Sequence, residues 1–171
     1  MRRWLLVCLA LAACAAPRSA PTPPGGLDVD GFRALMERVA AGWREGNAAK
    51  AVKCFTEDAL YEEPPRKQFH SGRADLFEFF GGEKGTELPM HVIWHHLVFD
   101  PGTQVGAGEY TFRLNRQYHG VVMVQLRDGP IARWREYQTE SSLPFEEFSA
   151  ATRFRDLGAA GGLLPVGRSP R

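Results

Sequence analysis

The chain has 171 residues, of which 44% are hydrophobic and 24% charged, as is usual for one globular domain with appended segments. Its 21 basic and 20 acidic side chains give a net charge of +1. This balance offers no basic surface for nucleic acid, so no nucleic-acid partner is predicted.

Residues 1–14 are predicted to be a targeting segment that does not belong to the fold. Two arginines precede an apolar run of about ten residues, which is too short for a mature membrane-spanning helix. The end of the run, Leu11-Ala12-Ala13-Cys14, resembles the lipobox of bacterial lipoproteins, which implies acylation of Cys14. An ordinary secretory leader with an incidental cysteine is the alternative. The preferred prediction is an exported, membrane-anchored lipoprotein of the cell envelope.

Residues 15–26 are rich in proline and predict an extended linker, and a single domain is predicted over residues 27–157. Two of the three cysteines, Cys8 and Cys14, lie in the targeting segment. Cys54 therefore has no partner for a disulfide within the domain. Its apolar neighbours favour a buried, unreactive thiol over a catalytic one.

The first half of the domain predicts three helices and one short strand. Apolar residues recur at helical spacing in the first segment, and Asp30 is its predicted N-cap. Gly46 is expected to end this helix, and Asn47 is expected to cap the next. The predicted elements are a helix over 32–43, a helix over 48–55, a strand over 59–63 and a helix over 72–80.

The second half predicts a four-stranded antiparallel meander, because β-branched and aromatic runs alternate with short turns rich in Gly, Pro, Asn and Asp. The predicted strands are 90–99, 105–114, 118–126 and 131–139. A helix over 145–156 and a disordered tail over 158–171 are expected to follow. The expected fold class is α+β: a cone-shaped roll in which the N-terminal helices cover the concave face of a curved antiparallel sheet.

Four phrases, taken in order, resemble the nuclear transport factor 2-like superfamily. They are Trp43-Arg-Glu-Gly-Asn47, Cys54-Phe-Thr-Glu-Asp-Ala-Leu-Tyr61 followed by Pro64, Phe69-His-Ser-Gly-Arg73, and Asp128-Gly-Pro-Ile-Ala-Arg-Trp-Arg-Glu-Tyr137. The resemblance covers residues 27–142 and is nearest to the SnoaL-like polyketide-cyclase and limonene-epoxide-hydrolase-like branches. It implies a pocket inside the cone and a homodimer formed through the outer face of the sheet.

Epoxide hydrolases of that branch use two aspartates and an arginine, helped by a tyrosine and an asparagine on the first strand. The resemblance puts the helper tyrosine at Tyr61 and the asparagine at Glu63. The charged positions fall on Thr139 and near Tyr110 and Phe112. Threonine has no pKa near neutrality and cannot replace an aspartate base, so this hydrolase chemistry is not expected.

The family register also implies which strand residues face the pocket, because side chains alternate between the two faces of a sheet. The implied inward residues are Tyr61, Glu63, Tyr110, Phe112, Arg135, Tyr137 and Thr139, and the implied outward residues are Trp134, Glu136 and Gln138. For the strand over 90–99 the inward set is either Trp94 and His96 or Ile93 and His95. The predicted ligand-binding residues are Tyr61, Glu63, Trp94, His95, His96, Tyr110, Phe112, Arg135 and Tyr137.

Glu63 is the candidate acid/base, with Tyr61 or a histidine as its helper, because apolar walls can tune a buried carboxyl for proton transfer. The alternative is a structural Glu63 held by Arg135 or a histidine. His91 and His95 are four residues apart in a strand-like run, and no cysteine or aspartate-rich motif accompanies them. Neither a metal site nor a cofactor is predicted.

Three functions remain open. The preferred one is a lipoprotein whose cone binds a small, partly apolar molecule. The second is an isomerase, cyclase or hydrolase that uses Glu63, and the third is a structural partner protein. The predicted partners are a small molecule, the membrane through acylated Cys14, and a second copy through the outer sheet face. Trp134 is expected at that dimer contact, with a ligand clamp made by Trp134 and Tyr137 as the alternative.

Overall fold

The computed structural model describes residues 21–86 and 89–152. The targeting segment with Cys14, the first part of the linker and the tail lie outside the described residues. Within the described ranges, no helix is long and apolar enough to cross a membrane.

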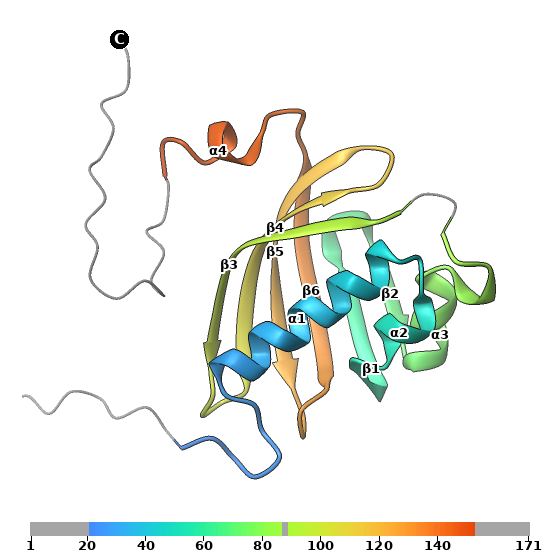
Figure 1. The fold of residues 1–171 in the computed structure, drawn as a ribbon, viewed down its shortest axis with the longest axis vertical. Coiled ribbons are helices and arrows are strands. Elements are labelled where there is room, and N and C mark those ends of the chain that lie inside the picture. Colours follow the sequence, from blue (N-terminus) through green and yellow to red (C-terminus); the bar gives the residue numbers. More distant parts are fainter. Residues whose placement is uncertain (1–20, 87–88, 153–171) are drawn as a thin grey trace, which may run out of the picture.

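One curved, six-stranded sheet forms the framework, and its strand order is β2-β1-β6-β5-β4-β3 (Figure 1). The strands are β1 (Phe55–Glu63), β2 (Gln68–Ser71), β3 (His91–Asp100), β4 (Val105–Arg113), β5 (Gln117–Leu126) and β6 (Ile131–Glu140). β3 to β6 pair antiparallel with their sequence neighbours, which confirms the predicted meander. β1 extends the sheet by pairing parallel with β6 and antiparallel with β2.

The longest helix, α1, crosses the concave side of the sheet, and α2 and α3 lie beside the β1–β2 end (Figure 1). The helices are α1 (Val29–Arg44), α2 (Ala48–Val52), α3 (Arg73–Phe79) and α4 (Phe145–Phe148), with short 3-10 turns η1 (Pro64–Arg66) and η2 (Gly82–Lys84). This arrangement confirms the predicted α+β cone. The six α1 side chains of the predicted stripe are all buried against the sheet. Phe32 stacks on Phe99 of β3 with ring centroids 4.4 Å apart.

The caps of the first two helices follow the sequence closely, with one correction. The N-cap of α1 is Asp28 and not Asp30, because the extended backbone of Asp28 lets its carboxylate accept a 2.8 Å hydrogen bond from Gly31 N. Asp30 lies in the first turn, where an acid still favours the helix N-terminus. Asn47 caps α2 as predicted, through a 2.8 Å bond from Lys50 N.

The β1–β2 hairpin differs from the sequence-based expectation. β1 begins at Phe55 and not at residue 59, because the fully buried Phe55 pairs with Ile131 of β6. Residues 56–58 are polar, so the hydrophobicity pattern does not indicate that the strand begins at Phe55. β2 was not predicted, since it is a polar edge strand of four residues. The turn between the strands requires a left-handed residue, Lys67, with φ at 56°.

The segment after β6 crosses the outer face of the sheet. α4 is shorter than the predicted helix over 145–156, and no side chain caps its N-terminus. Its Phe145 ring stacks on His95 of β3 with centroids 3.4 Å apart and an interplanar angle of 3°.

Cys54 is buried, and burial raises the pKa of its thiol, in agreement with the predicted unreactive role.

Candidate functional site

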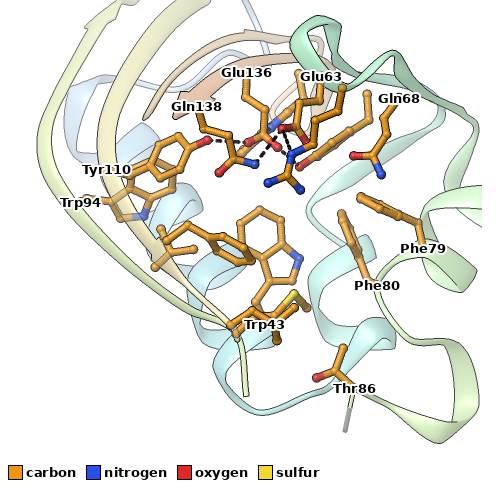
Figure 2. A pocket seen from close by; sticks show the side chains of 17 residues that line it. Trp43, Glu63, Gln68, Phe79, Phe80, Thr86, Trp94, Tyr110, Glu136 and Gln138 are labelled. Atoms are coloured by element: carbon orange, nitrogen blue, oxygen red, sulfur yellow. Dashed lines mark hydrogen bonds and ion pairs between the residues drawn. The ribbon is translucent and has the colours of Figure 1, made fainter. Parts of the chain in front are cut away.

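A cavity of about 210 Å³ opens between the concave face of the sheet and the helices α1 and α3 (Figure 2). Its walls are mostly aromatic and aliphatic, and its polar groups gather at one end, around Glu136, Gln138 and Glu63. The lining residues are Trp43, Tyr61, Glu63, Arg66, Gln68, Phe79, Phe80, Thr86, Met90, Val92, Trp94, Tyr110, Phe112, Leu114, Trp134, Glu136 and Gln138. A concave, largely apolar site with a few convergent polar groups is typical of small-molecule binding.

Glu136 lies at the centre of the polar end and is only 6% exposed. Its Oε1 accepts a 2.6 Å hydrogen bond from Tyr61 Oη, and its Oε2 accepts bonds from Tyr110 Oη at 3.0 Å and Trp134 Nε1 at 3.1 Å. The three donors come from β1, β4 and β6, so this carboxyl group on β6 connects the neighbouring strand β1 with β4, which lies two strands away on the other side. Burial raises the pKa of Glu136, although the hydrogen bonds from Tyr61 and Trp134 oppose that effect.

Glu63 is the second buried carboxylate and is 2% exposed. Within the described residues its ion pair and its hydrogen bond use the same oxygen: Oε1 lies 2.8 Å from Arg66 Nε and accepts a 2.9 Å bond from Gln138 Nε2. Arg66 follows directly from the Pro64-Pro65 turn, which returns its side chain to the end of β1. The guanidinium therefore compensates the charge of a carboxylate that burial alone would disfavour.

Five of the predicted ligand-binding residues line the cavity, namely Tyr61, Glu63, Trp94, Tyr110 and Phe112. The open choice on β3 is settled in favour of Trp94, since Ile93 lies on the outer face and is 47% exposed. Whether these side chains hold a ligand, and whether Glu63 and Tyr61 act in catalysis, remain predictions.

The predicted facing of β6 is wrong by one residue. Trp134, Glu136 and Gln138 face the cavity, whereas Arg135, Tyr137 and Thr139 lie on the outer face. Partners across a sheet point to the same side, and the inward Val122 and Val124 of β5 pair with Glu136 and Trp134.

Because the side-chain period of a strand is two residues, shifting the register by one moves every side chain to the other face. Arg133 and Arg135 flank Trp134 in the sequence, and this alternation alone indicates that the arginines face solvent. The family register implies the opposite facing, which the structure contradicts. Glu136 and Gln138 were missed as site residues for the same reason. Trp134 is 1% exposed and so cannot form the predicted outer-face contact.

The two adjacent histidines also lie outside the cavity. A bulge in β3 between Trp94 and His96 places both His95 and His96 on the outer face. His95 Nε2 lies 2.7 Å from Thr111 Oγ1, and His96 Nδ1 lies 2.7 Å from Glu109 Oε2. Neither ring can therefore assist Glu63. The alternative in which Arg135 or a histidine holds Glu63 is also wrong about the partner. Arg135 pairs with Glu62 at 2.7 Å, and Arg66 is the residue that pairs with Glu63.

We expect Glu136 to give the protein a distinct pH dependence of stability. The folded-state pKa is raised above the ordinary value of 4.5, so folding favours the protonated form. Its contribution to stability is complete below the unfolded-state pKa and is lost as pH rises through the folded-state pKa. Urea unfolding of the wild type and Glu136→Gln from pH 4 to 8 should show the wild type losing stability relative to the variant as pH rises. A relative gain over this range would contradict the burial effect.

Comparison with known proteins places the chain in a family. The SnoaL-like domain family matches residues 36–134, which is more than half of the chain. Among curated proteins, none matches the sequence.

Solved structures agree with this assignment at the level of the fold. An NTF-2 like protein of unknown function from Burkholderia xenovorans LB400 superposes with a TM-score of 0.57 at 14% identity, covering 74% of this chain and 95% of that one. The epoxide hydrolase/cyclase-like enzyme SalBIII, which has a role in pyran ring formation in the polyether salinomycin, superposes with a TM-score of 0.57 at 20% identity. The match covers 66% of this chain and 93% of that one. An LEH-like epoxide hydrolase from M. tuberculosis gives 0.51 at 17% identity, with 64% and 83% covered. With its matched domain, its curved sheet and the cavity inside its cone, the chain belongs to the SnoaL-like domain family, within the NTF2-like fold.

Proposed function

We propose that the chain binds a small, partly apolar molecule in the cavity inside its cone. The observation that carries the proposal is the division of the cavity into an aromatic part and a polar end. Rings such as Trp94 and Phe112 offer apolar contact, while Glu63, Glu136 and Gln138 offer hydrogen-bond acceptors at one place. This arrangement can bury the body of a ligand and orient it by one polar group.

We also propose a location in the cell and an assembly state for the protein. The predicted targeting segment and Cys14 support a lipoprotein of the cell envelope, held on a membrane by acyl chains. A homodimer through the outer sheet face is supported by exposed apolar side chains there, including Val121, Met123 and Tyr137. Tyr137 takes the outward position that had been expected for Trp134.

Native mass spectrometry of the protein purified from its own host tests these points together. An added mass that stays on the folded chain and is lost on denaturation would identify a cavity ligand. The denatured mass reports acylation of Cys14, and the native mass reports the number of subunits. A chain with no added mass that also shows no thermal shift with any metabolite would favour the third function, a structural partner protein.

The second candidate function is an isomerase, cyclase or hydrolase in which Glu63 transfers a proton. The specific observation in its favour is that a nearly fully buried carboxylate lines the cavity, with its hydrogen bond and its ion pair within the described chain both on one oxygen. Tyr61 donates its hydroxyl to Glu136, so its support for Glu63 is indirect, through the placement of the polar end.

Glu63→Gln separates the two functions, and Glu62→Gln is its matched control. Glu62 is the preceding residue on the same strand, but it faces outward and pairs with Arg135. If Glu63 is the base, the first variant should lower turnover of the identified ligand by about 100-fold or more and change its affinity far less. The control should change neither quantity. Equal turnover in both variants would remove the enzymatic function.

A further inference from the structure

Acids outnumber bases in the cavity. Among the described residues that line it, Glu63 and Glu136 are acidic and Arg66 is the one base. Two carboxylates and one guanidinium leave a charge of −1 when both acids are ionised and of zero when Glu136 is protonated. The cavity is therefore negative or neutral, and never positive, wherever Glu63 is ionised.

The single positive charge already has partners at the solvent side of the cavity. Arg66 Nε lies 2.8 Å from Glu63, and its guanidinium carbon lies 4.6 Å from the centre of the Tyr118 ring, outside the lining. The side chain is 42% exposed. An anionic ligand that contacted this guanidinium inside the cavity would also lie near the Glu63 carboxylate, which repels it, in a region where charge interactions are stronger than in water.

The hydrogen-bond groups at the polar end are biased in the same direction. The hydroxyls of Tyr61 and Tyr110 and the indole N–H of Trp134 all donate to Glu136. The amide nitrogen of Gln138 must face Glu63, because a carboxylate only accepts, and this leaves its Oε1 buried without a partner in the described chain. The buried atom at this end that has no partner in the described chain is therefore an acceptor, and it matches a ligand that donates.

Aromatic faces surround the space next to these acceptors. Trp94 and Tyr110 pack edge to face with centroids 5.6 Å apart, and Trp134 stacks on Tyr61 at 5.7 Å with an interplanar angle of 7°. The faces of tryptophan and tyrosine attract cations through the quadrupole of the ring. The remaining buried lining groups without a partner in the described chain are Trp43 Nε1 and Thr86 Oγ1, and Thr86 lies at the end of the cavity away from Glu63 (Figure 2).

We propose that the ligand of this cavity is an amine that binds as its ammonium form, with the cationic nitrogen between Glu63 and Gln138 Oε1 and the apolar body against the aromatic walls. The inference rests on the proposed binding function and narrows it to one chemical class. It is carried by the unpartnered Gln138 Oε1 beside Glu63, by the pairing of the arginine with Glu63 and by the aromatic surroundings together. An ammonium group can donate to Gln138 Oε1 and to the Glu63 carboxylate at once, which a neutral alcohol does only in part and a carboxylate does not do at all.

Three probes of nearly equal size test the charge preference: cyclohexylmethylamine, cyclohexylmethanol and cyclohexanecarboxylate. Binding to the full chain at pH 7 is followed by tryptophan fluorescence, since Trp43, Trp94 and Trp134 all line the cavity. The amine is expected to bind at least ten times more tightly than either of the other two. The Glu63→Gln variant should reduce this preference to about threefold or less, and Glu62→Gln should leave it unchanged.

The outcomes distinguish a failure of the amine assignment from a failure of the proposed small-molecule binding. If the alcohol or the carboxylate binds as tightly as the amine, the cavity binds small molecules but the amine assignment is wrong. If none of the three binds, the binding function itself is contradicted and the inference falls with it. The wild-type comparison decides the matter even if Glu63→Gln does not fold.

Discussion

Glu136→Ala is expected to lower the free energy of unfolding by at least about 3 kcal/mol, because it leaves three buried donors without their acceptor. These donors are the Tyr61 hydroxyl, the Tyr110 hydroxyl and the Trp134 indole N–H. Each unsatisfied buried donor costs roughly 1–3 kcal/mol. Urea unfolding followed by circular dichroism measures the loss.

Two variants serve as controls for this result. Glu136→Gln keeps the volume and one carbonyl acceptor, so its cost should be about 1 kcal/mol. Glu140→Ala removes a carboxylate from the same strand, but its ion pair with Arg116 is exposed on both sides, and its cost should stay below about 1 kcal/mol. If Glu136→Ala costs no more than Glu140→Ala, the three hydrogen bonds do not hold the polar end together.

Trp134→Ala is expected to cost about 3–5 kcal/mol, whereas Tyr137→Ala on the same strand should cost less than about 1 kcal/mol. Trp134 is 1% exposed and contacts the rings of Trp43, Phe55 and Tyr61, so its removal leaves a large void. Tyr137 is 49% exposed on the outer face and loses few contacts. Chemical unfolding of both variants gives the comparison.

This pair of variants is a direct test of the facing of β6. A larger cost for Tyr137→Ala than for Trp134→Ala in the monomeric protein would contradict the observed facing of β6 and support the facing that the family register implies. Dimerisation through the outer face would add a concentration-dependent cost to Tyr137→Ala alone, so the measurement is repeated at two protein concentrations.

Local patterns were sufficient for most of the elements. The spacing from Phe32 to Trp43 identified the buried face of α1, and all six stripe residues are buried. The turn residues after each run placed the meander strands within one or two residues of their observed ends. Elements with a weak local sequence signal were not predicted, and β2 is the example. A polar four-residue edge strand forms because β1 offers it backbone partners, and its own sequence does not require it.

The candidate site was recovered in part, and the reason differs between its two acids. Glu63 follows an apolar strand and precedes two prolines, so its place at the end of β1 could be inferred from local sequence. The family register places Glu136 on the outer face, whereas the alternation of Arg133, Trp134 and Arg135 indicates the inward position that the structure shows. Arg66 was missed because its contact with Glu63 depends on how the Pro64-Pro65 turn returns the chain.

The sequence by itself determined the α+β class, the meander, the buried stripe of α1 and the presence of an acid beside Tyr61, because each of these follows from local periodicity and turn chemistry. The tertiary structure decided which face of β6 looks inward, which arginine holds Glu63 and that three donors from separate strands meet on Glu136. These features depend on strand register and on pairing between distant segments. One residue of register exchanges the two faces of a strand, and no local pattern of hydrophobicity records a partner 75 residues away, as Glu136 is from Tyr61.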